Sequence, residues 1–401
     1  MDQQIANDQN PWQIFLIFLR LGLTSFGGPV AHLGFFRNEF VSRRHWLSDK
    51  NYTDLIALCQ FLPGPASSQV GFSLGLCRGG YSGAFSAWLG FTLPSAIVLA
   101  LFALGMTDGA FVLNTGALQG LKIVAVAVVA QAVWGMAKTF CTDTLRVSLM
   151  AASCAAILLM PTVLGLVGVI LLAGLLGLWL IKPALQSEHE PLPIKLSHLS
   201  AVIYLSLFFI LLMGLPVVTR ISSSETVSII DAFYRAGSLV FGGGHVVLPL
   251  LQAEVVPTGW IDTEVFLAGY GAAQAVPGPL FTFAAFLGAA MQSGPGGWLG
   301  ALLTLLAIFT PAFLLVLGCL PFWESLRRNS QMQAALIGIN AAVVGLLLAA
   351  LYQPVWTSSI HQPEDFVLAL LALIALMFWK LPPWLVVLAS GLMGWLSSIL
   401  F

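Results

Sequence analysis

The stretch Gln60-Phe-Leu-Pro63-Gly64-Pro65-Ala-Ser67-Ser68-Gln69 interrupts an otherwise apolar part of the chain. Proline lacks a backbone N–H and clashes with the preceding turn, so two prolines around a glycine break a helix here. A broken helix in lipid exposes backbone groups that only protein or a water-filled cavity can satisfy. The pattern returns at Gln274-Ala-Val-Pro277-Gly278-Pro279. Two such breaks, one in each half of the chain, predict a substrate site near the membrane midplane.

The composition defines the class of protein. Of 401 residues, 58% are hydrophobic and 8% are charged, against roughly 25% charged residues in soluble domains. The chain is therefore predicted to be an all-α polytopic membrane protein. A net charge of −1 gives no indication of nucleic-acid binding. The five cysteines form no CxxC or Cys/His cluster, so we expect no metal site and no cofactor.

Apolar segments of membrane-spanning length recur along the chain. They cover 12–36, 52–77, 82–105, 116–137, 145–160, 163–181, 199–216, 229–256, 264–292, 297–320, 332–353, 364–379 and 383–400. A polar stretch after the sixth segment is the clearest boundary. The predicted organisation is a first repeat at 1–181, a cytoplasmic linker at 182–198, an extra transmembrane helix at 199–216 and a second repeat at 217–401.

The two halves of the chain share a sequence pattern. Phe18-Leu-Arg20-Leu-Gly-Leu-Thr-Ser-Phe26-Gly27-Gly28 matches Phe233-Tyr-Arg235-Ala-Gly-Ser-Leu-Val-Phe241-Gly242-Gly243. Further pairs follow in the same order: Glu39 with Glu254, Gln60 with Gln274, Pro94 with Pro311, and Lys122 with Asn340. Because so many matches keep one order, we interpret the protein as an internal duplication.

The placement of lysine and arginine predicts that the repeats are inverted. Loop 37–50 is basic, whereas its counterpart 253–264 contains no Lys or Arg; conversely, 320–332 is basic and its counterpart 105–115 is not. Basic loops lie in the cytoplasm, so the two halves have opposite orientations. Segment 199–216, which has no counterpart, would turn the second half over.

The same charges favour re-entrant hairpins at the breaks. Loop 37–50 and Arg78 are both predicted to be cytoplasmic, so segment 52–77 is expected to enter the membrane and return to the cytoplasmic side. Segment 12–36, interrupted at Phe26-Gly27-Gly28-Pro29, is a second candidate hairpin. This interpretation gives nine crossings, whereas plain hydropathy gives thirteen, and both counts remain open.

Glycine pairs form a second kind of break, at Phe26-Gly27-Gly28-Pro29 and at Phe241-Gly242-Gly243-Gly244-His245. Glycine adopts the left-handed geometry that a chain reversal needs and lets the backbone approach a ligand closely. Half-helices that begin after the four breaks would direct their N-termini to a common centre, where they favour an anion. The alternative is that these glycines only allow close helix packing in lipid.

Three cations lie within apolar segments: Arg20, its counterpart Arg235, and Lys122. A charge at the bilayer centre costs at least roughly 2.5–3.5 kcal/mol, so such residues suggest function. A guanidinium group matches the oxygens of a tetrahedral oxyanion well. The alternatives are that these cations snorkel to the interface or pair with carbonyl groups, or that an arginine pairs with Asp231 or Glu39.

Neutral polar residues flank the breaks: Gln60, Gln274, Ser67, Ser68 and Thr282. They could donate hydrogen bonds to an oxyanion without trapping it, or they could only cap the broken helices. His245, which follows Gly244, is a candidate proton-coupling group, although a single histidine more often has a structural hydrogen bond. With mainly basic intramembrane groups and no Walker loop or HExxH motif, the cargo is predicted to be an anion.

The motifs Arg20-Leu-Gly-Leu-Thr-Ser-Phe26-Gly27-Gly28-Pro29, Gln60-Phe-Leu-Pro63-Gly64-Pro65, Phe241-Gly242-Gly243-Gly244-His245 and Pro277-Gly278-Pro279 resemble those of the chromate ion transporter family in its long, two-domain form. The resemblance implies a bacterial inner-membrane protein that exports chromate, confers chromate resistance and also encounters sulfate. It places function on Arg20, the glycine breaks and the Pro-Gly-Pro turns. The candidate substrate-binding residues are Arg20, Phe26, Gly27, Gly28, Gln60, Pro63, Gly64, Pro65, Ser67, Ser68, Lys122, Arg235, Gly242, Gly243, Gly244, His245, Gln274, Pro277, Gly278, Pro279, Thr282 and Asn340.

Rival functions stay open at this stage. One is the uptake or exchange of sulfate or another small anion. A second is an intramembrane enzyme such as a chromate reductase, and a third is a channel, which helix dipoles and arginines would also suit. The sequence does not distinguish a uniporter from a proton-coupled antiporter, or a monomer from a homodimer.

Overall fold

The computed structural model describes residues 10–107, 115–182 and 196–400, and every regular element among them is helical. The predicted linker lies mostly outside these residues, at 183–195. The first half of the chain contains α2 (Pro11–Thr24), α3 (Gly28–Phe36), a π-helical turn (Arg37–Arg43), α4 (Asp49–Phe61), α5 (Ala66–Thr107), α6 (Thr115–Phe140), α7 (Thr144–Leu159) and α8 (Val163–Leu180).

The second half repeats this order after the additional helix α9 (His198–Ile221). Its elements are α10 (Glu225–Leu239), a 3₁₀ turn (Gly244–Val246), α11 (Val247–Val255), α12 (Thr263–Ala273), a 3₁₀ turn (Leu280–Thr282), α13 (Phe283–Ala290), α14 (Gly297–Cys319), a 3₁₀ turn (Leu320–Phe322), α15 (Trp323–Arg328), α16 (Ser330–Ala350), a π-helical turn (Leu351–Trp356), α17 (Pro363–Met377) and α18 (Pro383–Leu400). The duplication seen in the sequence is therefore also a duplication of helices.

Local sequence explains where several helices begin. The side chain of Asn10 accepts a hydrogen bond from Trp12 N, and Pro11 occupies the first helical position of α2. Asp143 and Thr162 cap α7 and α8 in the same way, each accepting a hydrogen bond from a backbone N–H three residues further on. These caps satisfy donors that the first turn of a helix cannot pair internally.

The chain reverses direction inside α5. Gly79 and Gly80 have non-helical backbone angles, and a Cβ on Gly75 would collide with the carbonyl oxygen of Gly83. Because an α-helix separates residues eight apart by about 12 Å, this contact requires two antiparallel helices. The guanidinium of Arg78 lies 5.7 Å from the ring centroid of Trp46. The segment that begins at α4 thus returns to the end where it started, as the charge pattern predicts for a re-entrant hairpin.

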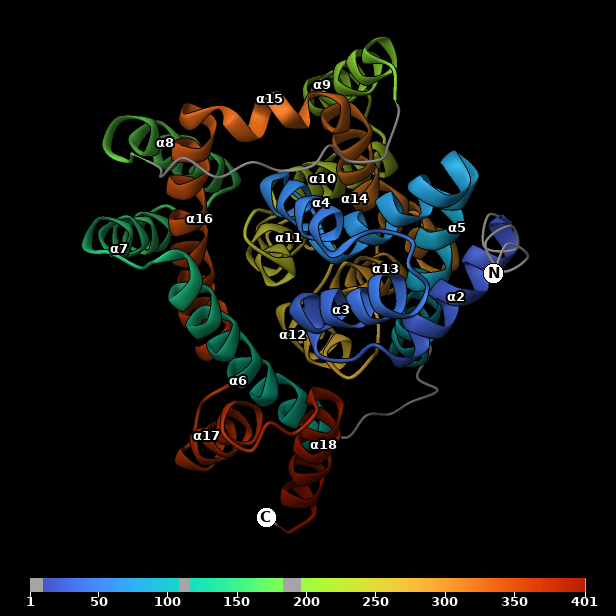
Figure 1. Cartoon of the computed structure of the whole chain (residues 1–401). Helices are drawn as coiled ribbons and strands as arrows, with labels where there is room; N and C mark the ends of the chain where they lie inside the picture. The colour runs from blue at the N-terminus through green and yellow to red at the C-terminus, as the bar shows by residue number, and fades with distance from the viewer. Residues whose placement is uncertain (1–9, 108–114, 183–195, 401) are drawn as a thin grey trace.

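The helices form two units that the repeats share (Figure 1). We call α6–α8 together with α16–α18 the frame, and α2–α5 together with α9–α14 the core unit. In the frame, α7 and α8 pack against α16 of the other repeat, α17 and α18 pack against α6, and α6 contacts α16. Such reciprocal packing is what two repeats related by a twofold axis produce.

Glycines permit the close helix contacts of the frame. A Cβ on Gly120 of α6 would collide with the carbonyl oxygen of Ser390 in α18. A Cβ on Gly338 of α16 would collide with that of Ala173 in α8. Small residues at these crossings let backbones approach closely, which is the usual basis of helix association in lipid.

Six helical spans among the described residues are long and apolar enough to cross a membrane: Ala66–Thr107, Thr115–Phe140, Val163–Leu180, His198–Ile221, Gly297–Phe322 and Ser330–Trp356. The first of these contains the reversal at Gly79–Gly80, so it is not one straight span. Four apolar sequence segments, 12–36, 52–77, 229–256 and 264–292, are each divided by a motif into shorter helices. The breaks predicted from glycine and proline therefore exist in the structure.

Candidate functional site

The four breaks meet at the centre of the core unit. The N–H of Gly64, in the first Pro-Gly-Pro turn, donates a 2.7 Å hydrogen bond to the carbonyl of Val240, just before the second glycine break. The N–H of Gly278, in the second turn, donates a 3.1 Å hydrogen bond to the carbonyl of Ser25, just before the first glycine break. Ser25 and Val240 occupy the same repeat position, as do Gly64 and Gly278. The two bonds are therefore reciprocal, and each joins one repeat to the other.

Only glycine fits the two central turns. Gly64 has a φ of 127° and Gly278 a φ of 107°, a region of backbone conformation that other residues rarely adopt. A Cβ on Gly64 would lie 2.8 Å from Cβ of Ala312, and a Cβ on Gly278 would lie 2.8 Å from Oγ of Ser95. Ala312 and Ser95 directly follow Pro311 and Pro94, which are matched in the repeats. Each turn thus packs against the proline-containing helix of the opposite repeat.

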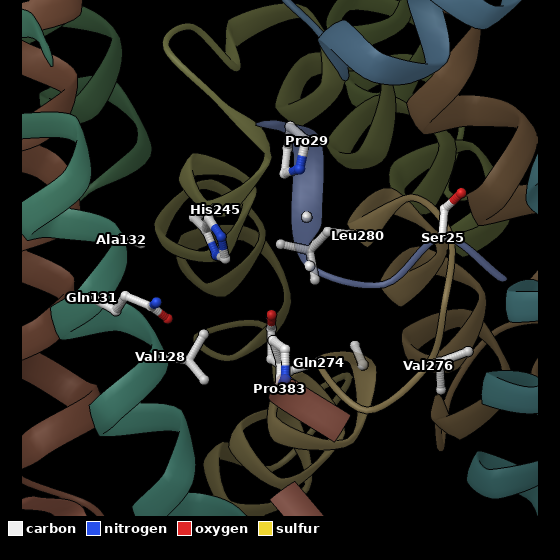
Figure 2. Close-up of a pocket in the computed structure, with 14 residues that line it drawn as sticks. Ser25, Pro29, Val128, Gln131, Ala132, His245, Gln274, Val276, Leu280 and Pro383 are labelled. Atoms are coloured by element: carbon white, nitrogen blue, oxygen red, sulfur yellow. The ribbon is translucent and has the colours of Figure 1, made fainter. Parts of the chain in front are cut away.

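A cavity of about 160 Å³, which we call the central cavity, lies beside this crossing (Figure 2). It is bounded by both glycine breaks, by the second Pro-Gly-Pro turn and by one face of α6. Its lining residues are Ser25, Gly27, Gly28, Pro29, Val128, Gln131, Ala132, His245, Ala273, Gln274, Val276, Gly278, Leu280 and Pro383. Figure 2 shows Gln131 extending from α6 toward the space beside His245 and Gln274.

A larger cavity of about 420 Å³, the inner chamber, shares four of these residues: Gly27, Pro29, Ala132 and His245. Its remaining lining comes from α3, α4, the first Pro-Gly-Pro turn, the second glycine break and the last turns of α6. Those residues are Leu33, Cys59, Gln60, Leu62, Gly64, Ala66, Gly135, Met136, Thr139, Phe140, Gly242, Gly243 and Gly244. The shared residues mark the junction of the two cavities.

The inner chamber lies in the half of the molecule that carries the basic loops. It extends to Thr139 and Phe140 in the last turn of α6, next to Lys138 and the loop that leads to Arg146. The buried side chains of Asp54 in α4, which follows basic loop 37–50, and of Arg327 in α15, which lies within basic loop 320–332, form a 3.0 Å ion pair. The positive-inside rule assigns these basic loops to the cytoplasm.

Ten of the predicted site residues line one or both cavities: Gly27, Gly28, Gln60, Gly64, Gly242, Gly243, Gly244, His245, Gln274 and Gly278. Most supply backbone rather than side chain, as expected of glycine breaks that approach a ligand. The amide nitrogen of Gln274 is buried without a hydrogen-bond partner. This donor is free to bind a ligand oxygen.

The three predicted cations lie elsewhere. Arg20 is exposed on α2, and Lys122 forms a 3.4 Å ion pair with Glu264. Arg235 pairs with Asp231 at 3.1 Å and with Glu254 at 2.9 Å. None of the described residues lining either cavity is Lys, Arg, Asp or Glu. The cationic centre expected from the sequence is thus replaced by a neutral one, because carboxylates pair with Lys122 and Arg235 and the side chain of Arg20 is exposed.

The remaining predicted residues hold the breaks in shape rather than line the cavities. Thr282 donates to the carbonyl of Pro279 at 2.7 Å, which is the capping role considered as the alternative. The Ser67 hydroxyl lies 3.4 Å from Nδ1 of His32, and Phe26 packs against the ring of Trp384. The others are Pro63, Pro65, Ser68, Pro277 and Asn340, whose Oδ1 lies 3.5 Å from where a Cβ on Gly242 would stand.

Sequence reasoning missed the contribution of α6. Val128, Ala132 and Met136 recur every four residues, as do Gln131, Gly135 and Thr139 beside them, so the six residues share one face of the helix. This stripe lines both cavities. The spacing Gln131, Gly135, Thr139 within an apolar helix was the signal that could have found it, since polar and small residues on one face of a transmembrane helix point to a packed or wet surface.

The arrangement suits reversible binding of a small anion. Backbone N–H groups at the breaks, the amides of Gln131 and Gln274 and the ring of His245 can donate hydrogen bonds. Neutral donors bind an oxyanion less tightly than a fixed ion pair would, and such binding lets the ion leave again. Within the described residues, no group of His, Cys, Asp and Glu is arranged to hold a metal ion.

Comparison with known proteins decides which kind of transporter has this architecture. The family model described as "Chromate transporter" matches residues 12–178 and 227–395, once in each half. The chain belongs to the chromate transporter family. It is 28% identical to the chromate transport protein of Pseudomonas aeruginosa, over 96% of this chain and 92% of that one. It is also 28% identical to the probable chromate transport protein of Synechococcus elongatus, over 96% of this chain and 95% of that one.

A third relative, the chromate transport protein of Cupriavidus metallidurans, is 24% identical over 95% of this chain and 92% of its own length. No solved structure matches the chain. Family membership and the apolar helices together identify a multi-pass membrane transport protein. The two family matches coincide with the two sets of helices, so the repeats of the chromate transporter family are the repeats described above.

Proposed function

We propose that this member of the chromate transporter family exports chromate from the cytoplasm across the bacterial inner membrane and thereby confers chromate resistance. The observation that carries the proposal is the reciprocal crossing of Gly64 with Val240 and of Gly278 with Ser25, beside a neutral cavity. We extend the proposal to the organisation of the chain, with repeats at 1–181 and 217–401 joined by a cytoplasmic linker at 182–198 and an added span at 199–216.

The energetics favour export of a dianion. Each elementary charge is worth about 2.3 kcal/mol per 100 mV, so a divalent anion leaving a negative-inside cell gains roughly 4.6 kcal/mol per 100 mV. The lining therefore has no need to bind chromate tightly. Neutral donors would hold chromate weakly enough for the membrane potential to drive its release.

The packing of the two repeats supports alternating access. On one side of the crossing, α6 packs against α12, with Gly271 directly against the carbonyl of Leu121. The equivalent pair, α4 and α16, makes no comparable packing among the described residues. The inner chamber, bounded by α3, α4 and α6, lies on that unpacked side. This asymmetry is what an inward-facing state of an inverted-repeat transporter would have.

The test is the flux of labelled chromate into inverted membrane vesicles under an imposed potential. Accumulation that saturates, requires the protein and is abolished in Gln131→Leu would support the proposal. The matched control is Gln13→Leu, because Gln13 is an exposed residue of α2 away from both cavities. No protein-dependent flux under any gradient would overturn the proposal, and loss of chromate as chromium(III) without flux would indicate a reductase.

Sulfate uptake or exchange is the second candidate. A neutral lining of backbone and amide donors recognises the shape and charge of a tetrahedral dianion, which chromate and sulfate share. In the same vesicles, labelled sulfate replaces chromate and the potential is reversed. Sulfate flux with no chromate flux would favour this second function.

A further inference from the structure

His245 occupies a singular place on the anion path. It is one of the four residues that line both the central cavity and the inner chamber. Among the described lining residues it is the only Asp, Glu, Lys, Arg or His. Among these five residue types, His245 is therefore the one whose side chain can change its charge within the two cavities. Figure 2 shows the ring between Ala132 of α6 and Leu280.

The partner of the ring is a hydroxyl group. Nδ1 of His245 lies 2.9 Å from Oη of Tyr270, a residue with no exposed surface. A tyrosine hydroxyl can donate to a neutral imidazole or accept from a protonated one. The pair is thus compatible with both charge states of the histidine, whereas a carboxylate partner would hold the charged form permanently.

Charged groups on the surrounding elements are engaged elsewhere. On α12, Glu264 pairs with Lys122 of α6, and on α11, Glu254 pairs with Arg235. On α6, the ammonium of Lys138 lies 4.9 Å from the ring centroid of Trp134. On α3, Nε2 of His32 donates to the carbonyl of Ser25 at 3.2 Å. On α16, Asn340 is neutral. On α4, Cys59 lines the inner chamber but not the central cavity.

A dianion that enters this neutral site loses water without meeting an opposite charge. Such burial is costly unless a counter-charge appears, and protonation of a nearby base supplies one. We propose that His245 binds one proton together with the divalent oxyanion, so that the occupied site carries one negative charge rather than two. This inference rests on the proposed function, because the oxyanion is the counter-ion of the protonated ring.

The proton balance is simple. The free site holds a neutral imidazole, and water on the open side supplies one proton when the anion binds. In the bound state Nδ1–H donates to Oη of Tyr270 and Nε2–H is left to donate to an oxygen of the anion. When the anion leaves, the ring returns its proton to water. One oxyanion and one proton therefore move together, and the net charge transferred per cycle is −1. The membrane potential then drives export half as strongly as it would drive the bare dianion.

The inference is tested by calorimetric titration of the purified full-length protein in lipid nanodiscs with chromate, at mildly alkaline pH where chromate is the dianion. Repeating the titration in buffers of different ionisation enthalpy counts the protons taken up. The wild type should take up about one proton per anion, and its Kd should rise by about tenfold per pH unit. In His245→Gln, which keeps a hydrogen-bond donor, both effects should disappear.

The control is His361→Gln, since His361 is an exposed residue away from both cavities; it should keep the wild-type proton count. Chromate binding by the wild type with no proton uptake would overturn the inference and leave the proposed function standing. An unchanged proton count in His245→Gln would overturn it as well. Absence of chromate binding by the wild type at every pH would instead overturn the proposed function. If His245→Gln does not fold, a wild-type count of zero protons per anion still overturns the inference.

Discussion

Replacing Gly64 with alanine tests the central crossing most directly. The Gly64 backbone has a φ of 127°, and holding a non-glycine residue in such a region costs roughly 1–3 kcal/mol. The added methyl would also lie 2.8 Å from Cβ of Ala312 and 2.9 Å from Nε2 of Gln69. Overpacking of this kind costs roughly 1–3 kcal/mol. We therefore expect Gly64→Ala to lower the free energy of unfolding by roughly 2–6 kcal/mol.

Two other glycines separate the backbone effect from the steric one. Gly28 has a φ of 77° and nothing within 4 Å of its added Cβ, so Gly28→Ala should cost only roughly 1–2 kcal/mol. Gly34 lies within α3 with an ordinary φ and open space around its added Cβ. Gly34→Ala should stabilise the helix by roughly 0.5–1 kcal/mol.

The assay is denaturant unfolding of the three variants in one detergent, together with chromate flux in vesicles. Equal destabilisation by Gly64→Ala and Gly28→Ala would refute the contact with Ala312. A stabilising effect of Gly64→Ala would refute the positive-φ turn itself, and with it the hydrogen bond to Val240 on which the site is built. Flux should fall in Gly64→Ala and stay near the wild-type level in Gly34→Ala.

Three further predictions follow from other parts of the molecule. In an outward-facing state the contact between α12 and α6 should be exchanged for the equivalent contact between α4 and α16. Cysteines at Ala57 and Ile339, the repeat counterparts of Gly271 and Leu121, should then cross-link in a cysteine-free background only when the protein faces outward. Cross-linking that does not depend on substrate or potential would contradict alternating access. Arg20→Ala should leave the KM for chromate unchanged in flux assays, since the side chain is exposed and lines neither cavity, whereas abolished transport would support a central cation. Arg327→Leu should destabilise the protein by roughly 3–5 kcal/mol, because it removes the guanidinium that forms a 3.0 Å ion pair with the buried carboxylate of Asp54. An unfolding free energy equal to that of the wild type would show that this ion pair is not needed.

Much of the fold was predictable from residue types alone. Proline restricts the backbone locally and glycine permits conformations that other residues rarely adopt, so the breaks at Gly27–Gly28 and Pro63–Pro65 could be placed without knowing what surrounds them. The re-entrant return of the segment after α4 also followed from sequence, because charge placement reports membrane side. The boundaries of α6 differ from the predicted 116–137 by a few residues only.

The chemistry of the site was less predictable. An arginine in an apolar segment indicates only that its charge needs a partner or access to water, and the sequence does not show which of these it has. Arg235 pairs with Asp231 on its own helix and with Glu254 on α11, whereas Arg20 remains exposed although Glu39, the repeat counterpart of Glu254, is present. Glu39 instead pairs with Arg43 and Arg44 at 3.1 and 2.7 Å.

The sequence by itself determined that this is a duplicated helical membrane protein of the chromate transporter family, broken at four matched places. These properties depend on composition and on local backbone chemistry, which involve only residues close together in the sequence. Only the tertiary structure decided that the four breaks pair across the repeats through Gly64 and Gly278, that the face of α6 with Gln131 completes the cavities, and that the site is neutral. Those properties depend on which side chains meet across hundreds of residues, and packing rather than local preference selects the partners.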